Sequence, residues 1–235
     1  MRGERNYGTE NRYQKEFIRS ELRPVLYEHG FVLSRPTAYV RECNGLVQEF
    51  YFKVEKYRLR PWVSCRPIFD ARMSIVSFGE DNIYVSDCLN PYRGFGWVSY
   101  RDWPGYDLQK EYEKFQAGLG PLKSSIVNGV LPELDTINSL DDFMKLYEEN
   151  GLFLQRKIQS YPSGDNYFPF IRDVYYSSGI TRMKHIMEAM VDWDVNKAVR
   201  EYLQECEAKM TSDEEADRMF EEYCNKVRAA YKLIK

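Results

Sequence analysis

The sequence lacks the recognisable motifs of catalytic and metal centres. It has two histidines among 235 residues, and its five cysteines include no C-x-x-C pair. Neither an H-x-x-x-H pair, nor EF-hand spacing of acids, nor a glycine-rich phosphate loop is present. We therefore expect no metal, no other cofactor and no catalytic residues, and we expect that the chain is not an enzyme.

Long apolar runs are also missing. No stretch approaches the roughly 20 apolar residues that span a bilayer. The first residues, MRGERNYGTENRYQ, do not resemble a signal peptide. The cysteines are odd in number and widely spaced, which is typical of reduced thiols and not of a disulfide framework. These features favour a cytoplasmic protein that does not associate with a membrane.

Charge is divided unevenly along the chain, although the net charge is only -3. Residues 1–106 hold 16 Lys and Arg against 13 Asp and Glu, whereas residues 107–235 hold 17 against 23. The second half is therefore acidic. An acidic surface attracts a basic partner, but it says nothing about the fold.

The N-terminal part begins with an amphipathic pattern. Apolar residues recur at helical spacing over residues 11–29, and Gly30 follows in the position of a helix cap. Pro24 lies inside this pattern, so we expect a kink near Leu22. His29 falls at the end of the predicted helix, where the helix dipole favours an imidazolium.

From residue 31 the apolar period changes from 3.6 to two. One strand is predicted over residues 31–43, a hairpin turn at Asn44-Gly45, and a second strand in which Phe50, Phe52 and Val54 share the core face. Further strands are predicted over residues 61–69 and near residues 73–78. An antiparallel meander packed on the first helix is the simplest arrangement.

After residue 106 the pattern is mostly helical. Helices are predicted to begin at Asp107, at Pro121 and at Ser139, which forms a cap with Asp142. Residues 160–179 are predicted to be a turn-rich aromatic connection. Two further helical patterns follow, over residues 183–191 and 195–206. In the last helix we expect a capping box of Thr211 with Glu214 and an apolar stripe formed by Phe220, Tyr223, Val227 and Tyr231.

These patterns together predict an α+β fold. Residues 1–106 would contain the N-terminal helix packed on an antiparallel β-meander. Residues 107–235 would form a helical C-terminal half that packs on the sheet, so that the chain makes one compact unit.

The stretch LNPYRGFGWVSYRDWPGYD, residues 89–107, is unusually rich in aromatic and arginine side chains. Tyr, Trp and Arg carry much of the binding energy at protein interfaces. If the stretch is not simply a loop that covers the core, it is a contact site. The partner-binding residues that we expect are Tyr92, Arg93, Phe95, Trp97, Tyr100, Arg101, Trp103 and Tyr106.

Two other kinds of function remain open. Lys53, Lys56, Arg58, Arg60 and Trp62 could bind single-stranded nucleic acid by neutralising phosphates and stacking on bases, or they could be a solvated strand edge. An enzyme with an unrecognised site is the other alternative. Its sign would be a polar pocket that holds Cys65 or Asp87 beside His29.

The run FIRSELRPVLYEHGF and the strand QEFYFKV carry a resemblance. The matching residues are Leu22, Pro24, Leu26, Gly30 and Phe31. Over about the first hundred residues, the chain resembles a family of small bacterial domains of unknown function, in which a helix and a Gly-Phe turn precede antiparallel strands. The resemblance implies a bacterial or phage origin and an α+β fold, and it brings no catalytic residues.

The leading hypothesis is a protein that binds another protein without catalysis. It would be an inhibitor or immunity protein of a bacterial conflict or antiviral defence system, or of a phage. The aromatic and arginine stretch would supply contacts, and the acidic helical half would face a basic partner such as a nuclease. The sequence leaves the oligomeric state open.

Overall fold

The computed structural model describes residues 14–55, 58–71, 117, 119–145, 167–191 and 195–233. These residues divide into two compact units, and each unit is assembled from three stretches of the chain. The first unit holds the described residues up to Arg41, those from Gln48 to Ser64, and those from 117 to Thr136. The others form the second unit. The predicted boundary at residue 106 lies outside the described residues and stays a prediction.

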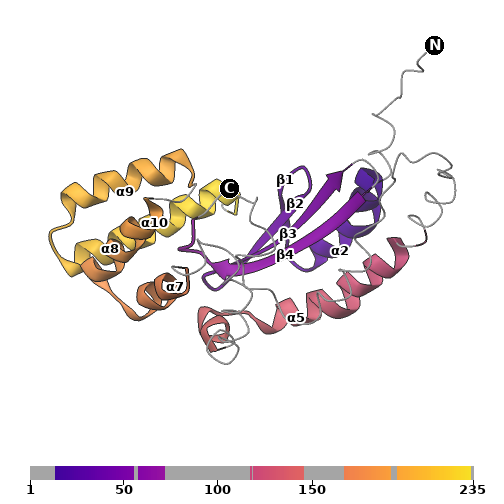
Figure 1. Ribbon diagram of the computed structural model, residues 1–235, viewed down its shortest axis with the longest axis horizontal. Coiled ribbons are helices and arrows are strands. Elements are labelled where there is room, and N and C mark those ends of the chain that lie inside the picture. The colour runs from indigo at the N-terminus through magenta and orange to yellow at the C-terminus, as the bar shows by residue number, and fades with distance from the viewer. Residues whose placement is uncertain are drawn as a thin grey trace, which may run out of the picture. The chain divides into compact units, whose positions relative to one another are not determined.

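The predicted α+β class is confirmed, because a helix precedes a four-stranded antiparallel sheet and further helices follow (Figure 1). The strands stand in the order β1-β2-β3-β4, so each lies beside its neighbour in sequence, as in the predicted meander. Their bounds are Val32–Arg35 for β1, Ala38–Cys43 for β2, Leu46–Glu55 for β3 and Arg58–Pro67 for β4.

The turns of the sheet confirm one prediction and correct another. Asn44 and Gly45 have φ angles of 44° and 86°, as a two-residue hairpin turn of the favoured type requires. Residues 31–43, in contrast, are not one strand, because a turn at Pro36-Thr37 separates β1 from β2. Proline has no N–H to donate to a neighbouring strand, and its fixed φ suits a turn.

Two other strand predictions have different outcomes. The strand predicted over residues 61–69 is β4, which begins earlier, at Arg58, and ends at Pro67. The alternation of apolar residues does not indicate where β4 begins, because Pro61 interrupts it three residues after Arg58. The strand predicted near residues 73–78 lies outside the described residues.

The first helix contains the break that was predicted near Leu22. A π-helical turn, η1 (Ile18–Leu22), leads directly into α2 (Arg23–Glu28), and Pro24 lies in the first turn of α2. The N–H of Arg23 donates to the carbonyl of Ile18, five residues back. The wider turn accommodates a proline that has no N–H and would crowd an α-helical carbonyl.

The same arrangement recurs in the helix that ends the first unit. The π-helical turn η3 (Ile126–Val130) precedes α5 (Leu131–Thr136), in which Pro132 is the second residue. Residues 119 and 120 are already helical, so this helix does not begin at Pro121 as predicted. Gly120 does not end the helix, because burial of the apolar face of the helix outweighs the low helix propensity of glycine.

Four buried aromatic side chains pack together in the core of the first unit. The rings of Phe31 and Phe50 lie 5.3 Å apart, and those of Tyr39 and Phe52 lie 6.1 Å apart. Phe50 and Phe52 are fully buried, as predicted, whereas Val54 is only half-buried. Leu26 of α2 is buried as well, and the 119–136 helix contributes the buried residues Leu122, Ile126, Val130, Leu131 and Leu134.

The second unit is mainly helical. Its long helices are α7 (Tyr167–Tyr176), α8 (Gly179–Met190), α9 (Lys197–Lys209) and α10 (Asp213–Tyr231), drawn in orange to yellow in Figure 1. α8 packs against α7 and α10, and α9 packs against α10. The predicted cap at Ser139 is confirmed, since its Oγ accepts the backbone N–H of Asp142 at 3.1 Å.

Two predictions for the second unit are wrong in detail. Residues 167–176 are a helix and not a turn-rich connection, because Phe170, Ile171 and Val174 bury one helical face. The N-cap of α10 is Ser212, whose Oγ accepts the backbone N–H of Glu215, so the cap lies one residue later than the predicted pair of Thr211 and Glu214. The remainder of the predicted connection, residues 160–166, lies outside the described residues.

Candidate functional site

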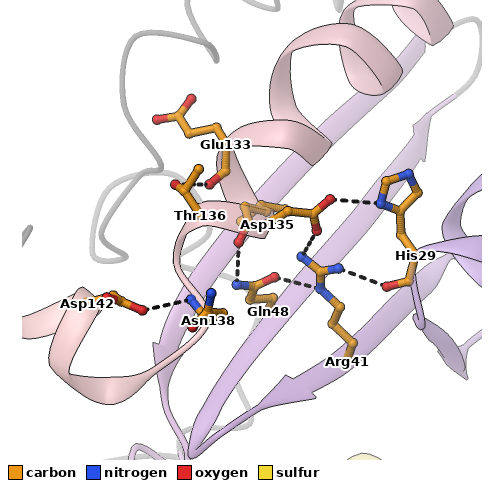
Figure 2. A network of polar contacts seen from close by, with 9 residues as sticks. His29, Arg41, Gln48, Glu133, Asp135, Thr136, Asn138 and Asp142 are labelled. Carbon is orange, nitrogen blue, oxygen red and sulfur yellow. Dashed lines mark hydrogen bonds and ion pairs between the residues drawn. The ribbon is translucent and has the colours of Figure 1, made fainter.

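Arg41 is the centre of a polar cluster in the first unit (Figure 2). It lies on β2 with its side chain nearly buried over the ring of Phe31, 4.6 Å from the ring centroid. Its NH1 donates to the backbone carbonyl of His29 at 2.8 Å, at the end of α2. Its NH2 forms an ion pair of 2.6 Å with Asp135, in the last turn of α5.

Gln48 of β3 completes the buried side of this cluster. Its Oε1 accepts from Arg41 Nε at 2.7 Å, and its Nε2 donates to the carbonyl of Leu134 at 3.0 Å. Gln48 is fully buried on the strand face that also carries Phe50 and Phe52. Both ends of its amide are therefore bonded, as a buried polar group requires.

The outer side of the cluster pairs an imidazole with a carboxylate. His29 Nδ1 lies 3.0 Å from Asp135 Oδ2, and the two side chains are 32% and 40% exposed. His29 occupies the C-terminal end of α2, as predicted. A carboxylate that orients an imidazole is one part of many general-base sites, but here the same carboxylate also neutralises Arg41.

The cluster links secondary-structure elements of the first unit. Arg41 joins β2 to α2 and α5, and Gln48 joins β3 to α5. Within the described ranges, no group of three or more His, Cys, Asp or Glu side chains could hold a metal ion. We interpret the cluster as a clasp that fixes the ends of α2 and α5 on the sheet.

A second feature, in the other unit, is the acidic hairpin of α9 and α10. Residues 201–222 hold nine Asp and Glu against two Lys and Arg. Most of these carboxylates are exposed. The exposed ones are Glu201, Glu205, Glu207, Asp213, Glu214, Glu221 and Glu222.

Some of these carboxylates have bonds within the hairpin. Glu205 lies 3.7 Å from Lys209, and Glu222 accepts from the hydroxyl of Tyr202 at 2.8 Å. Burial, together with this contact to a carboxylate, raises the pKa of Tyr202, so its hydroxyl stays protonated. Glu207 and Glu214, by comparison, form no ion pair or side-chain hydrogen bond with any residue that the structure describes, and their charge is available to a partner.

The residues predicted for binding have different outcomes. All eight of the aromatic and arginine stretch lie outside the described residues, as do Lys56 and Asp87. Lys53 belongs to β3, and Arg58, Arg60 and Trp62 occupy alternate positions of β4. Cys65 is buried at the end of β4.

One residue of the sequence indicates the clasp, namely Gln48. Gln48 stands two residues before Phe50, on the strand face that the apolar pattern assigns to the core. A polar side chain on such a face indicates a buried hydrogen-bond network. Its partners could not be found in this way, because Leu134 and Asp135 lie far away in sequence.

Comparisons with protein-family models, with curated protein sequences and with solved structures found no match. The resemblance to a family of small bacterial domains therefore stays a prediction. Of the helices within the described residues, none combines the length and apolar composition of a membrane-spanning segment.

Proposed function

We propose that this chain acts by binding another protein and not by catalysing a reaction, as an inhibitor or immunity protein of a bacterial or phage conflict system. The observation that carries the proposal is the concentration of exposed carboxylates on α9 and α10. Such a surface complements the basic surface of a nucleic-acid enzyme, because opposite charges accelerate encounter and select its orientation. A nuclease is therefore the partner class that we propose.

The packing of the hairpin supports this proposal. Leu203 and Cys206 of α9, with Met219 and Tyr223 of α10, are buried, so the two helices are held together by an apolar stripe. The carboxylates therefore stand on a packed scaffold, and little conformational entropy is lost when a partner binds it.

The aromatic and arginine stretch, residues 92–106, is the second contact region in the proposal. Its residue types are those that contribute most at protein interfaces. In this arrangement the carboxylates would steer the partner, and the rings and guanidinium groups would supply most of the affinity. The double variant Arg93→Ala/Arg101→Ala should accordingly accelerate dissociation more than it slows association.

The carboxylates can be tested by neutralising two that form no ion pair or side-chain hydrogen bond with the described residues. The variant Glu207→Gln/Glu214→Gln removes two charges from the hairpin, and Glu28→Gln/Glu188→Gln removes two exposed charges from α2 and α8. Each protein is immobilised and used to purify partners from a bacterial lysate cleared of nucleic acid. We expect a basic protein on the wild type and on the control, and much less of it on the hairpin variant.

The complex with that protein should also weaken as salt is raised, mainly through slower association. Equal recovery on all three proteins, or recovery of nucleic acid in place of protein, would contradict the proposal.

Single-stranded nucleic-acid binding is the second candidate. It is favoured by one observation: Lys53 is on β3 and Arg58, Arg60 and Trp62 are on β4, and these strands are neighbours in the sheet. Filter binding of an oligonucleotide across a salt series tests it, because affinity that depends on phosphate contacts falls steeply with salt. The variant Arg58→Ala/Arg60→Ala should then flatten that salt dependence.

A further inference from the structure

We draw no further inference here: the strongest candidate, the outer edge of β1, where Val32 and Leu33 are 42% and 37% exposed, carries nothing because the described part of the chain contains no observation that shows what would cover it.

Discussion

The carboxylate of Glu215, in the first turn of α10, bonds the residue that precedes the N-cap. The Glu215 side chain accepts hydrogen bonds from the hydroxyl and the backbone N–H of Thr211, at 2.8 and 3.3 Å. These bonds favour the charged form and lower the pKa of Glu215 below its ordinary value. Because the pKa is lower in the folded state, the stabilisation is present above the unfolded pKa and is lost as the pH falls through the folded value.

Glu215→Gln should therefore reduce the acid sensitivity of the fold. The substitution keeps an acceptor for Thr211 but removes the titrating charge, so the melting temperature should fall less between pH 7 and the acid range than in the wild type. Thermal unfolding followed by circular dichroism measures this. Glu214→Gln is the matched control, since Glu214 forms neither of the Thr211 bonds. If the melting temperatures of both variants depended on pH in the same way, the bonds of Glu215 to Thr211 would not be the source of the acid sensitivity.

Arg41 offers a second test on a single side chain. Arg41→Met keeps much of the packing over Phe31 but removes the guanidinium that donates to the buried Gln48 side chain and to the His29 carbonyl. A hydrogen bond from a charged group contributes about 1.5–3 kcal/mol, so the free energy of unfolding should fall by about that amount. Asp135→Asn should cost less, below about 1 kcal/mol, because that side chain is 40% exposed and water can replace the ion pair. Urea unfolding compares the two, and an equal or larger loss for Asp135→Asn would show that Arg41 is not the centre of the clasp.

Among the elements, α8 takes its N-terminal cap from another helix. The backbone N–H of Ile180 donates to Asp213 of α10 at 2.9 Å, and that of Gly179 donates to Asp217 at 2.8 Å. Ser178, at the N-cap position, gives no side-chain bond. Carboxylates are favourable partners for a helix N-terminus because of the helix dipole, so these bonds join α8 to α10.

The close approach of Asp213 makes Gly179 hard to replace. Gly179 has φ +55°, and a Cβ added there would collide with the Asp213 carboxylate. Gly30 has φ +79° but open space around it. Gly30→Ala should therefore lower the free energy of unfolding only by the strain of a left-handed alanine, roughly 1–2 kcal/mol.

Gly179→Ala should cost more than Gly30→Ala, and chemical denaturation measures both. Adding Asp213→Ala to Gly179→Ala should recover part of the difference, because the two substitutions share one contact. Equal losses for the two glycine variants would mean that the carboxylate moves aside freely.

Local signals predicted some elements and missed others for physical reasons. The Asn44-Gly45 turn and the break before Pro24 follow from backbone conformation alone, so the sequence was sufficient to predict them. α7 was missed because its aromatic residues suit strands and connections as well as helices, and only burial of one face decides between them. The alternation over residues 31–43 continues through Pro36, although proline is tolerated at the edge of a sheet or in a turn and not inside a paired strand.

At the scale of the whole molecule, contacts between residues far apart in sequence could not be predicted from the sequence. His29 and Asp135 are 106 positions apart, and Tyr223 and Phe69 are 154 apart. Apolar periodicity carries no information on such pairs, so the sequence predicted most of the described helices and strands but not the clasp. The eight predicted contact residues of the aromatic and arginine stretch fall outside the described residues and remain predictions.

The second unit depends on residues from the N-terminal part of the chain. The buried hydroxyl of Tyr223 donates to the carbonyl of Phe69 at 2.8 Å, and the ring of Phe69 contacts Phe170 and Phe220. Burial raises the pKa of Tyr223 well above its ordinary value, so the hydroxyl remains a donor across the usual pH range. Helices that depend in this way on residues 65–71 should not form a stable unit alone.

A fragment of residues 137–235 should therefore fold poorly. It retains α7 to α10 but loses Phe69, so Phe170 and Phe220 lose a ring contact and the Tyr223 hydroxyl loses its acceptor. We expect helical far-ultraviolet circular dichroism with a broad thermal transition and weak near-ultraviolet signals, as in a loosely packed state. Tyr223→Phe in the full chain is the control, since it removes only the hydrogen bond and should cost about 1 kcal/mol while unfolding stays cooperative. A fragment that unfolds as sharply as the full chain would show that the helices need nothing from residues 42–47 and 65–71.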